Sequence, residues 1–114
     1  PYADVRVHVT TFGEPRVGNA AFATFAARHA HRSARVTWRR DIVPHLPPRA
    51  FGLYHHAPRE LFYEANATRF ATCDGSGEDA ACADRYDWYE PREHTRYLGV
   101  YQSDDDGVPS CTQY

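Results

Sequence analysis

The chain has 114 residues, 42% of them hydrophobic and 14% aromatic, which favours one folded, water-soluble domain or part of one. Its 13 Lys and Arg residues face 15 Asp and Glu residues, and the net charge of −2 argues against a nucleic-acid binder. No apolar run approaches the ~20 residues that cross a bilayer, and no charged-then-apolar leader opens the chain.

The first third of the chain predicts a strand, a helix and a second strand. Val5, Val7 and Val9 alternate with polar residues, which predicts a strand with one buried face. Asn19 is a suitable N-cap for a helix whose apolar stripe is formed by residues 22, 25, 26 and 29. The segment 35–38 is β-branched and aromatic and predicts the second strand. Such a strand–helix–strand unit places its two strands in parallel.

The remainder of the chain predicts short elements separated by loops. Three prolines in the segment 44–48 cannot continue a ladder and predict a stiff loop. Segments 53–56, 61–64 and 68–72 predict short strands, and 94–99 predicts one turn of helix. The chain has neither internal repeats nor a linker that marks a domain boundary, so residues 1–114 are expected to belong to a single domain.

The three cysteines are an informative feature of the composition. Cys73 and Cys82 flank a short polar segment and are either bridged or free thiols. Cys111 then has no partner, and an odd cysteine in an oxidising compartment predicts a partner outside this chain. Asn66 opens an Asn-Ala-Thr glycosylation sequon, which has meaning in a secreted protein. Together these features favour an extracellular location.

The seven histidines do not predict a metal site. His55 and His56 are adjacent, so on a strand their side chains point to opposite faces. The chain contains no CxxC, HxxxH or HExxH pattern and no Gly-rich phosphate loop, so neither a metal nor another cofactor is expected. Asp41 follows the second strand at the sheet edge where α/β proteins bind ligands. It is either a functional or a loop-capping carboxylate, and His94 is either functional or a surface histidine.

Three segments resemble, in order and at similar spacing, motifs of the fungal class 3 lipase family. Residues 10–22 resemble the signature that follows the nucleophile helix in this family. Residues 35–48 resemble the family's next strand and the loop that carries its triad acid, and residues 94–99 resemble its terminal histidine motif. The resemblance implies an α/β-hydrolase fold with a mostly parallel sheet and helices packed on it, and a triad in the chain order Ser, Asp, His. It assigns Asp41 as the triad acid and His94 as the base.

The chain departs from the family pattern at the nucleophile. No Gly-x-Ser-x-Gly occurs in the sequence, and none of the serines at 33, 76, 103 and 110 lies in a strand-to-helix elbow. The nucleophile and the oxyanion hole are therefore expected before residue 1, in an N-terminal chain or segment of the same enzyme. The family ties its C-terminus to its N-terminal region by a disulfide, so the resemblance implies that Cys111 links the two parts.

The resemblance also implies a substrate groove. Residues matching Ile42, Val43 and Leu46 line the acyl groove of the lipases, although packing in the core explains three apolar residues equally well. Thr95 stands where many of the lipases carry a large apolar residue. That polar residue, with the loop between Cys73 and Cys82, is also similar to feruloyl esterases of the family.

Three hypotheses follow. The first is a secreted serine ester hydrolase of the triacylglycerol lipase type, with contact to a lipid surface and no nucleic-acid partner. The second is a feruloyl or other carbohydrate-linked esterase of the same family. The third is a non-catalytic, hydrolase-like remnant that binds a surface or a partner.

Overall fold

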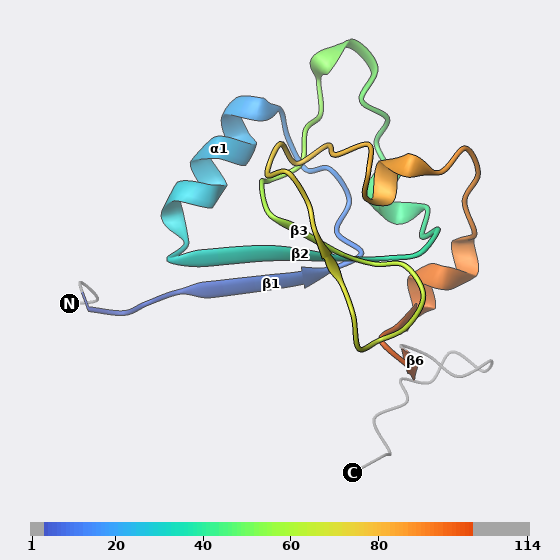
Figure 1. The fold of residues 1–114 in the computed structure, drawn as a ribbon. Coiled ribbons are helices and arrows are strands. Elements are labelled where there is room, and N and C mark those ends of the chain that lie inside the picture. The colour runs from blue at the N-terminus through green and yellow to red at the C-terminus, as the bar shows by residue number, and fades with distance from the viewer. Residues whose placement is uncertain (1–3, 102–114) are drawn as a thin grey trace.

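The computed structural model describes residues 4–101, which form a mostly parallel sheet with one α-helix against it (Figure 1). The sheet has four strands in the order β1-β2-β3-β4, and β4 alone is antiparallel to its neighbour. The strands are β1 (His8–Phe12), β2 (Arg32–Trp38), β3 (Glu60–Tyr63) and β4 (Ala71–Thr72). The α/β class and the parallel pairing of the first two strands are confirmed.

Helix α1 (Ala20–His29) begins where the sequence predicts it, because the side chain of Asn19 accepts a hydrogen bond from the backbone N–H of Phe22 at 2.9 Å. The predicted apolar stripe does not form the buried face of this helix. Phe22 and Phe25 are 46% and 57% exposed, whereas Ala23 is buried. Ala26, Ala27 and Ala30 line a cavity of about 140 Å³ together with residues of β1 and β2.

Strand β1 lies at the edge of the sheet and begins three residues later than predicted, at His8. The prediction of one buried valine face is also wrong, since Val5, Val7 and Val9 are 55%, 47% and 40% exposed. β1 pairs only with β2 among the described residues. The valines are exposed because nothing in the described part of the chain packs over the face to which they project.

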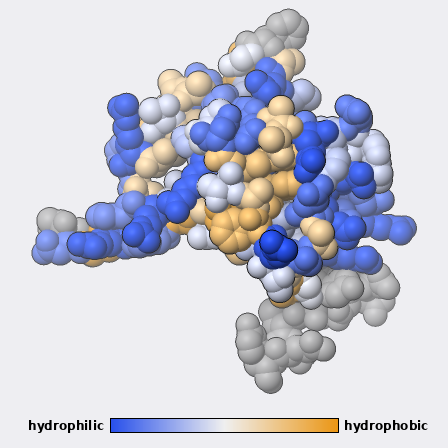
Figure 2. Space-filling model, in the orientation of Figure 1, coloured by the Kyte–Doolittle hydropathy of each residue, from blue (hydrophilic) through white to orange (hydrophobic). Residues whose placement is uncertain are grey.

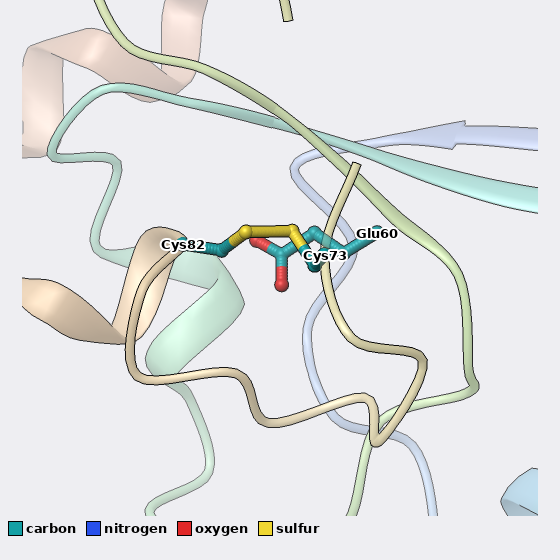
Figure 3. A group of neighbouring side chains, drawn as sticks. All are labelled: Glu60, Cys73 and Cys82. Carbon is teal, nitrogen blue, oxygen red and sulfur yellow. A yellow bond between two sulfur atoms is a disulfide. The ribbon is translucent and has the colours of Figure 1, made fainter. Parts of the chain in front are cut away.

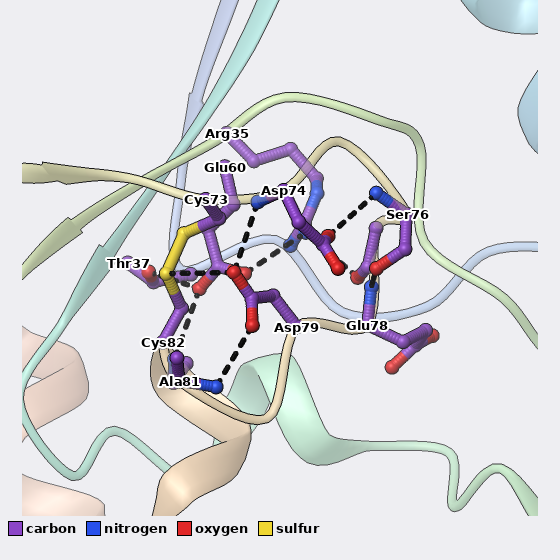
Figure 4. The surroundings of a disulfide bond; sticks show 12 residues. Arg35, Thr37, Glu60, Cys73, Asp74, Ser76, Glu78, Asp79, Ala81 and Cys82 are labelled. Atoms are coloured by element: carbon purple, nitrogen blue, oxygen red, sulfur yellow. Dashed lines mark hydrogen bonds and ion pairs between the residues drawn. A yellow bond between two sulfur atoms is a disulfide. The ribbon is translucent and has the colours of Figure 1, made fainter.

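The core lies around the two inner strands. One cluster consists of Val36, Trp38 and Tyr97, and a second consists of Phe62, Cys82 and Ala83. Cys73 and Cys82 are joined by a disulfide that packs with the second cluster, so they are bridged rather than free (Figure 4). Arg35, Thr37 and Glu60 are buried beside it, and the carboxylate of Glu60 accepts a hydrogen bond from Thr37 and pairs with Arg35.

Several short elements differ from the sequence-based predictions. Segment 53–56 is not a strand: only His55 forms an isolated bridge, with Gly18. The strand predicted at 61–64 is β3, shifted by one residue, and that predicted at 68–72 is only the two-residue β4. The loops contain three short 3₁₀ helices, η1 (Val43–His45), η2 (Ala50–Gly52) and η3 (Ala83–Arg85), and a fourth precedes β5 (Arg96–Tyr97). No helix among residues 4–101 is long and apolar enough to cross a membrane.

The segment predicted as one helical turn at 94–99 contains two different elements. The 3₁₀ helix η4 (Pro91–Thr95) ends at Thr95, and the antiparallel hairpin of β5 (Arg96–Tyr97) and β6 (Val100–Tyr101) follows. Leu98 and Gly99 have φ values of +54° and +84°, a left-handed conformation that a helix cannot continue. The hairpin thereby returns the chain directly after His94.

Candidate active site

Asp41 lies at the carboxyl end of β2 and is 2% exposed. Its backbone N–H donates to the carbonyl of Trp38 at 3.0 Å, which closes a tight turn immediately after the strand. Its Oδ1 accepts a hydrogen bond from the backbone N–H of Val43 at 2.9 Å. A buried carboxylate needs such donors, because burying an unpaired charge is costly.

His94 comes from η4 and lies beside Asp41, although 53 positions separate the two residues. Its Nδ1 is 3.0 Å from Oδ2 of Asp41. The side chain of His94 is 33% exposed, whereas that of Asp41 is almost completely buried. With Nδ1 directed at the carboxylate, Nε2 lies on the opposite edge of the ring. This is the arrangement in which a carboxylate orients an imidazole.

Tyr97 completes the surroundings of the carboxylate and was not singled out by the sequence analysis. Its hydroxyl donates a hydrogen bond to Oδ2 of Asp41, the oxygen that also faces His94. Tyr97 is 4% exposed, and burial together with this carboxylate raises its pKa well above the ordinary value. The hydroxyl therefore remains a donor. The signal in the sequence that could have identified Tyr97 is its position within the histidine motif 94–99.

Gly13, directly after β1, allows these groups to meet. Its φ is +59°, and its backbone N–H donates to the carbonyl of Val36 at 3.0 Å. A Cβ at this position would lie 2.7 Å from Oδ2 of Asp41 and 2.8 Å from both Nδ1 of His94 and the hydroxyl of Tyr97. Only glycine fits both the backbone conformation and the space.

We therefore expect Gly13→Ala to damage the site. The new methyl group would separate Asp41 from His94 and would strain the backbone, with an expected loss of at least about 1 kcal/mol in the free energy of unfolding. Gly99→Ala is a matched control, since Gly99 has φ +84° but open space around its Cβ. Urea unfolding of both variants and a structure of Gly13→Ala would check this. An intact contact between Asp41 and His94 in Gly13→Ala would contradict the prediction.

The predicted groove residues are only partly brought together. Ile42 and Leu46 line a cavity of about 500 Å³, and Leu46 is 44% exposed. Val43 and Thr95 are not among the described residues that line it. The hydroxyl of Thr95 donates to the carbonyl of Arg92 at 3.0 Å within η4. A substrate-binding role of these four residues stays a prediction.

Charged and aromatic side chains also line this cavity, together with Pro48 and Ala80. The buried guanidinium of Arg16 donates to both carboxylate oxygens of Glu78, at 2.9 and 2.7 Å, and lies 3.6 Å from Asp84. His45 lies 3.1 Å from Asp84 and stacks on Tyr89. A hydrogen bond from His45 lowers the pKa of Asp84 to about 2. The cavity therefore combines an apolar edge with an ion-paired wall.

Other residues singled out in the sequence have separate surroundings. Nε2 of His55 contacts the carbonyl of Ser76 at 2.9 Å, and Nε2 of His56 contacts that of Pro44 at 2.6 Å. Burial lowers the pKa of His56 to about 4. Asn66 is exposed, and its side-chain oxygen accepts hydrogen bonds from Thr68. Its glycosylation stays a prediction, and Cys111 lies outside the described residues.

Glu60, Cys73 and Cys82 form a cluster of metal-binding residue types (Figure 3). The two sulfur atoms are bonded to each other, so they lack the thiolate form that binds metals. The carboxylate of Glu60 accepts hydrogen bonds from the hydroxyl of Thr37 at 2.6 Å and from the N–H of Ala83 at 3.3 Å. Burial raises the pKa of Glu60. We assign this cluster a structural role in joining β3 to the disulfide loop.

Comparisons with known proteins identify the fold and the family. A family model described as lipase (class 3) matches residues 2–51. A lipase of Rhizomucor miehei is 32% identical over 91 residues, which are 79% of this chain and 25% of that protein. A secreted mono- and diacylglycerol lipase of Fusarium solani is 38% identical over 71 residues, which are 57% of this chain and 21% of that protein.

Solved structures agree with the sequence matches. A structure of a triacylglycerol lipase in which a serine protease triad forms the catalytic centre has a TM-score of 0.72 and 34% identity, and the match covers 82% of this chain and 36% of that one. A fungal lipase–inhibitor complex has a TM-score of 0.74 and 33% identity, with 90% and 37% covered. The fold is that of an α/β-hydrolase. The chain belongs to the class 3 lipase family, and it spans about a quarter of the length of the curated Rhizomucor relative.

Proposed function

We propose that this chain supplies the acid and the base of a Ser-His-Asp triad in a secreted, lipase-like ester hydrolase. The observation that carries this proposal is the 3.0 Å contact between Nδ1 of His94 and Oδ2 of the buried Asp41. The partly exposed His94 ring has its second nitrogen available on the edge away from Asp41. A hydroxyl at that edge can be deprotonated.

The proposed steps follow from the geometry. Nε2 of His94 accepts the proton of a serine hydroxyl as that oxygen attacks the ester carbonyl, and it later returns the proton to the leaving alcohol. Asp41 holds the proton on Nδ1 and stabilises the imidazolium that forms. Tyr97 and the N–H of Val43 hold Asp41 in place from its other sides.

The proposed nucleophile comes from an N-terminal chain or segment, and this chain is then the C-terminal part of one hydrolase domain. The open edge of β1 supports this, because Val7, Val9 and Phe12 are exposed there by 40% to 47%. An edge strand is a template for a further strand, and a nucleophile-bearing strand paired with β1 would pack beside these side chains. Figure 2 shows a hydrophobic area near the centre of the face viewed. Cys111 is the proposed covalent link.

The proposed substrates are acylglycerols. The curated relatives include lipases that are described as secreted and as acting on mono- and diacylglycerols. Ile42, which follows Asp41 in the chain, and Leu46 offer apolar surface in the cavity of about 500 Å³, as an acyl chain requires. Secretion is supported by the disulfide, which persists in oxidising compartments, and by the exposed sequon at Asn66.

One observation favours the second candidate, a feruloyl or other carbohydrate-linked esterase. The cavity that holds Ile42 and Leu46 is also lined by ion-paired and aromatic side chains, including Asp84 and Tyr89. Such groups bind hydroxyls and aromatic rings better than they bind an alkyl chain. The proposed triad is therefore compatible with two substrate classes, acylglycerols and carbohydrate-linked esters.

A single preparation distinguishes the three hypotheses. The native protein, isolated with every disulfide-linked piece, is treated with a fluorophosphonate probe and assayed on tributyrin and methyl ferulate. We expect one labelled serine, located in the partner segment, and faster hydrolysis of tributyrin. Faster hydrolysis of methyl ferulate would favour the second candidate, and no labelled serine would favour a non-catalytic remnant. Intact mass before and after reduction tests the Cys111 link, since a single 13.0 kDa species under both conditions would exclude it.

A further inference from the structure

The turn that carries His94 has little packing of its own. η4 is a five-residue 3₁₀ helix with no buried residue. The 3₁₀ geometry makes poorer hydrogen bonds than an α-helix, so a short exposed turn of this kind needs contacts from elsewhere to hold its position. A displacement of the turn moves the imidazole relative to Asp41.

Glu93, the residue before His94, makes such a contact. Its Oε2 accepts a hydrogen bond from the indole N–H of Trp38 at 2.8 Å, and its Oε1 lies 3.6 Å from the guanidinium of Arg39. Trp38 is 8% exposed and belongs to a core cluster, so its ring is a fixed anchor. Arg39 is half-exposed, and its ion pair with Glu93 is therefore the weaker contact.

The anchor also lies on the segment that carries the acid. Trp38 ends β2 and its carbonyl accepts from the N–H of Asp41, so indole and carboxylate are parts of one tight turn. We propose that Glu93 is a positioning residue for His94, because its carboxylate joins the histidine turn to the Asp41 turn through the indole of Trp38. This inference rests on the proposed triad.

The structure offers a conservative variant and a matched control. In Glu93→Gln the amide oxygen still accepts from Trp38, whereas Glu93→Ala removes the acceptor. Trp38→Phe keeps the aromatic packing and removes the donor. Glu90→Ala is the control, since the side chain of Glu90 caps the same turn through the N–H of Arg92 without contacting Trp38. The N–H of Glu90 binds the carbonyl of Arg40, and this backbone contact survives the substitution.

The test uses the complete, disulfide-linked enzyme on tributyrin. A misplacement of about 1 Å can cost roughly 100-fold in rate, so we expect Glu93→Ala to lower kcat by about 10- to 100-fold with little change in KM. Glu93→Gln and Glu90→Ala should keep kcat within about threefold. Trp38→Phe should match Glu93→Ala, and the double variant should be no slower than either, as expected for two partners of one contact.

A second readout separates positioning from a general loss of structure. The proton resonance of His94 Nδ1–H should be unchanged in Glu93→Gln and shifted or broadened in Glu93→Ala. If Glu93→Ala does not fold, Trp38→Phe and Glu93→Gln decide the question by the same two measurements. Equal losses of kcat in Glu93→Gln and Glu93→Ala would overturn the role of Glu93 and leave the triad standing. Full kcat in Glu93→Ala, while His94→Ala is inactive, would do the same. An active His94→Ala would instead overturn the triad on which it rests.

Discussion

Asp41→Asn is expected to lower kcat of the complete enzyme by roughly 10⁴, the loss that other Ser-His-Asp triads show for this change. Asp41 accepts hydrogen bonds at both oxygens, from Val43 at Oδ1 and from His94 and Tyr97 at Oδ2. An amide accepts at only one of its two atoms. Whichever way Asn is placed, an NH₂ group faces a donor, and His94 loses its preferred tautomer or its orientation.

The measurement is kcat on tributyrin together with the free energy of unfolding. Leaving a buried donor unpaired costs about 1–3 kcal/mol, so stability should fall moderately while activity falls by orders of magnitude. Asp87→Asn is the matched control, because Asp87 is exposed and lies outside the site. A kcat within tenfold of the parent enzyme would show that Asp41 is a loop-capping carboxylate and nothing more.

His94→Ala is expected to remove turnover almost completely, with a loss in kcat of roughly 10⁶ if it resembles removal of a triad histidine elsewhere. No other described side chain that contacts Asp41 can accept a proton from a serine near neutral pH, since Tyr97 remains protonated. The side chain of His94 is one-third exposed. Asp41 also keeps two donors in the variant, so little stability should be lost.

Activity on tributyrin and thermal unfolding of His94→Ala check this prediction. His31→Ala serves as the control, because His31 is exposed and follows α1, at the opposite end of β2 from Asp41. Normal turnover by His94→Ala would refute the triad assignment. A large drop in the unfolding temperature with inactive protein would instead indicate that the ring has a structural role.

Local sequence patterns predicted the elements that depend on neighbouring residues. The Asn19 cap and the strand–helix–strand unit are confirmed, because capping and alternation are determined over a few positions. The apolar stripe of α1 and the buried face of β1 were wrong, since which face is covered depends on distant parts of the chain. The same holds for segment 53–56, whose backbone binds Gly18 rather than a strand.

At the site, local residue patterns predicted which chemical groups are present and in which order they occur. They marked a carboxylate after β2 and a histidine motif near the end of the chain, and the resemblance assigned them roles that stay predictions. The folded chain places Nδ1 of His94 3.0 Å from the carboxylate of Asp41. Gly13 leaves room for this contact, Tyr97 contacts Asp41, and Glu93 contacts Trp38. These contacts join the ends of β1 and β2 to η4 and β5. Contacts between residues so far apart in the sequence form only when the whole sheet and its loops pack, so short-range sequence patterns do not predict them.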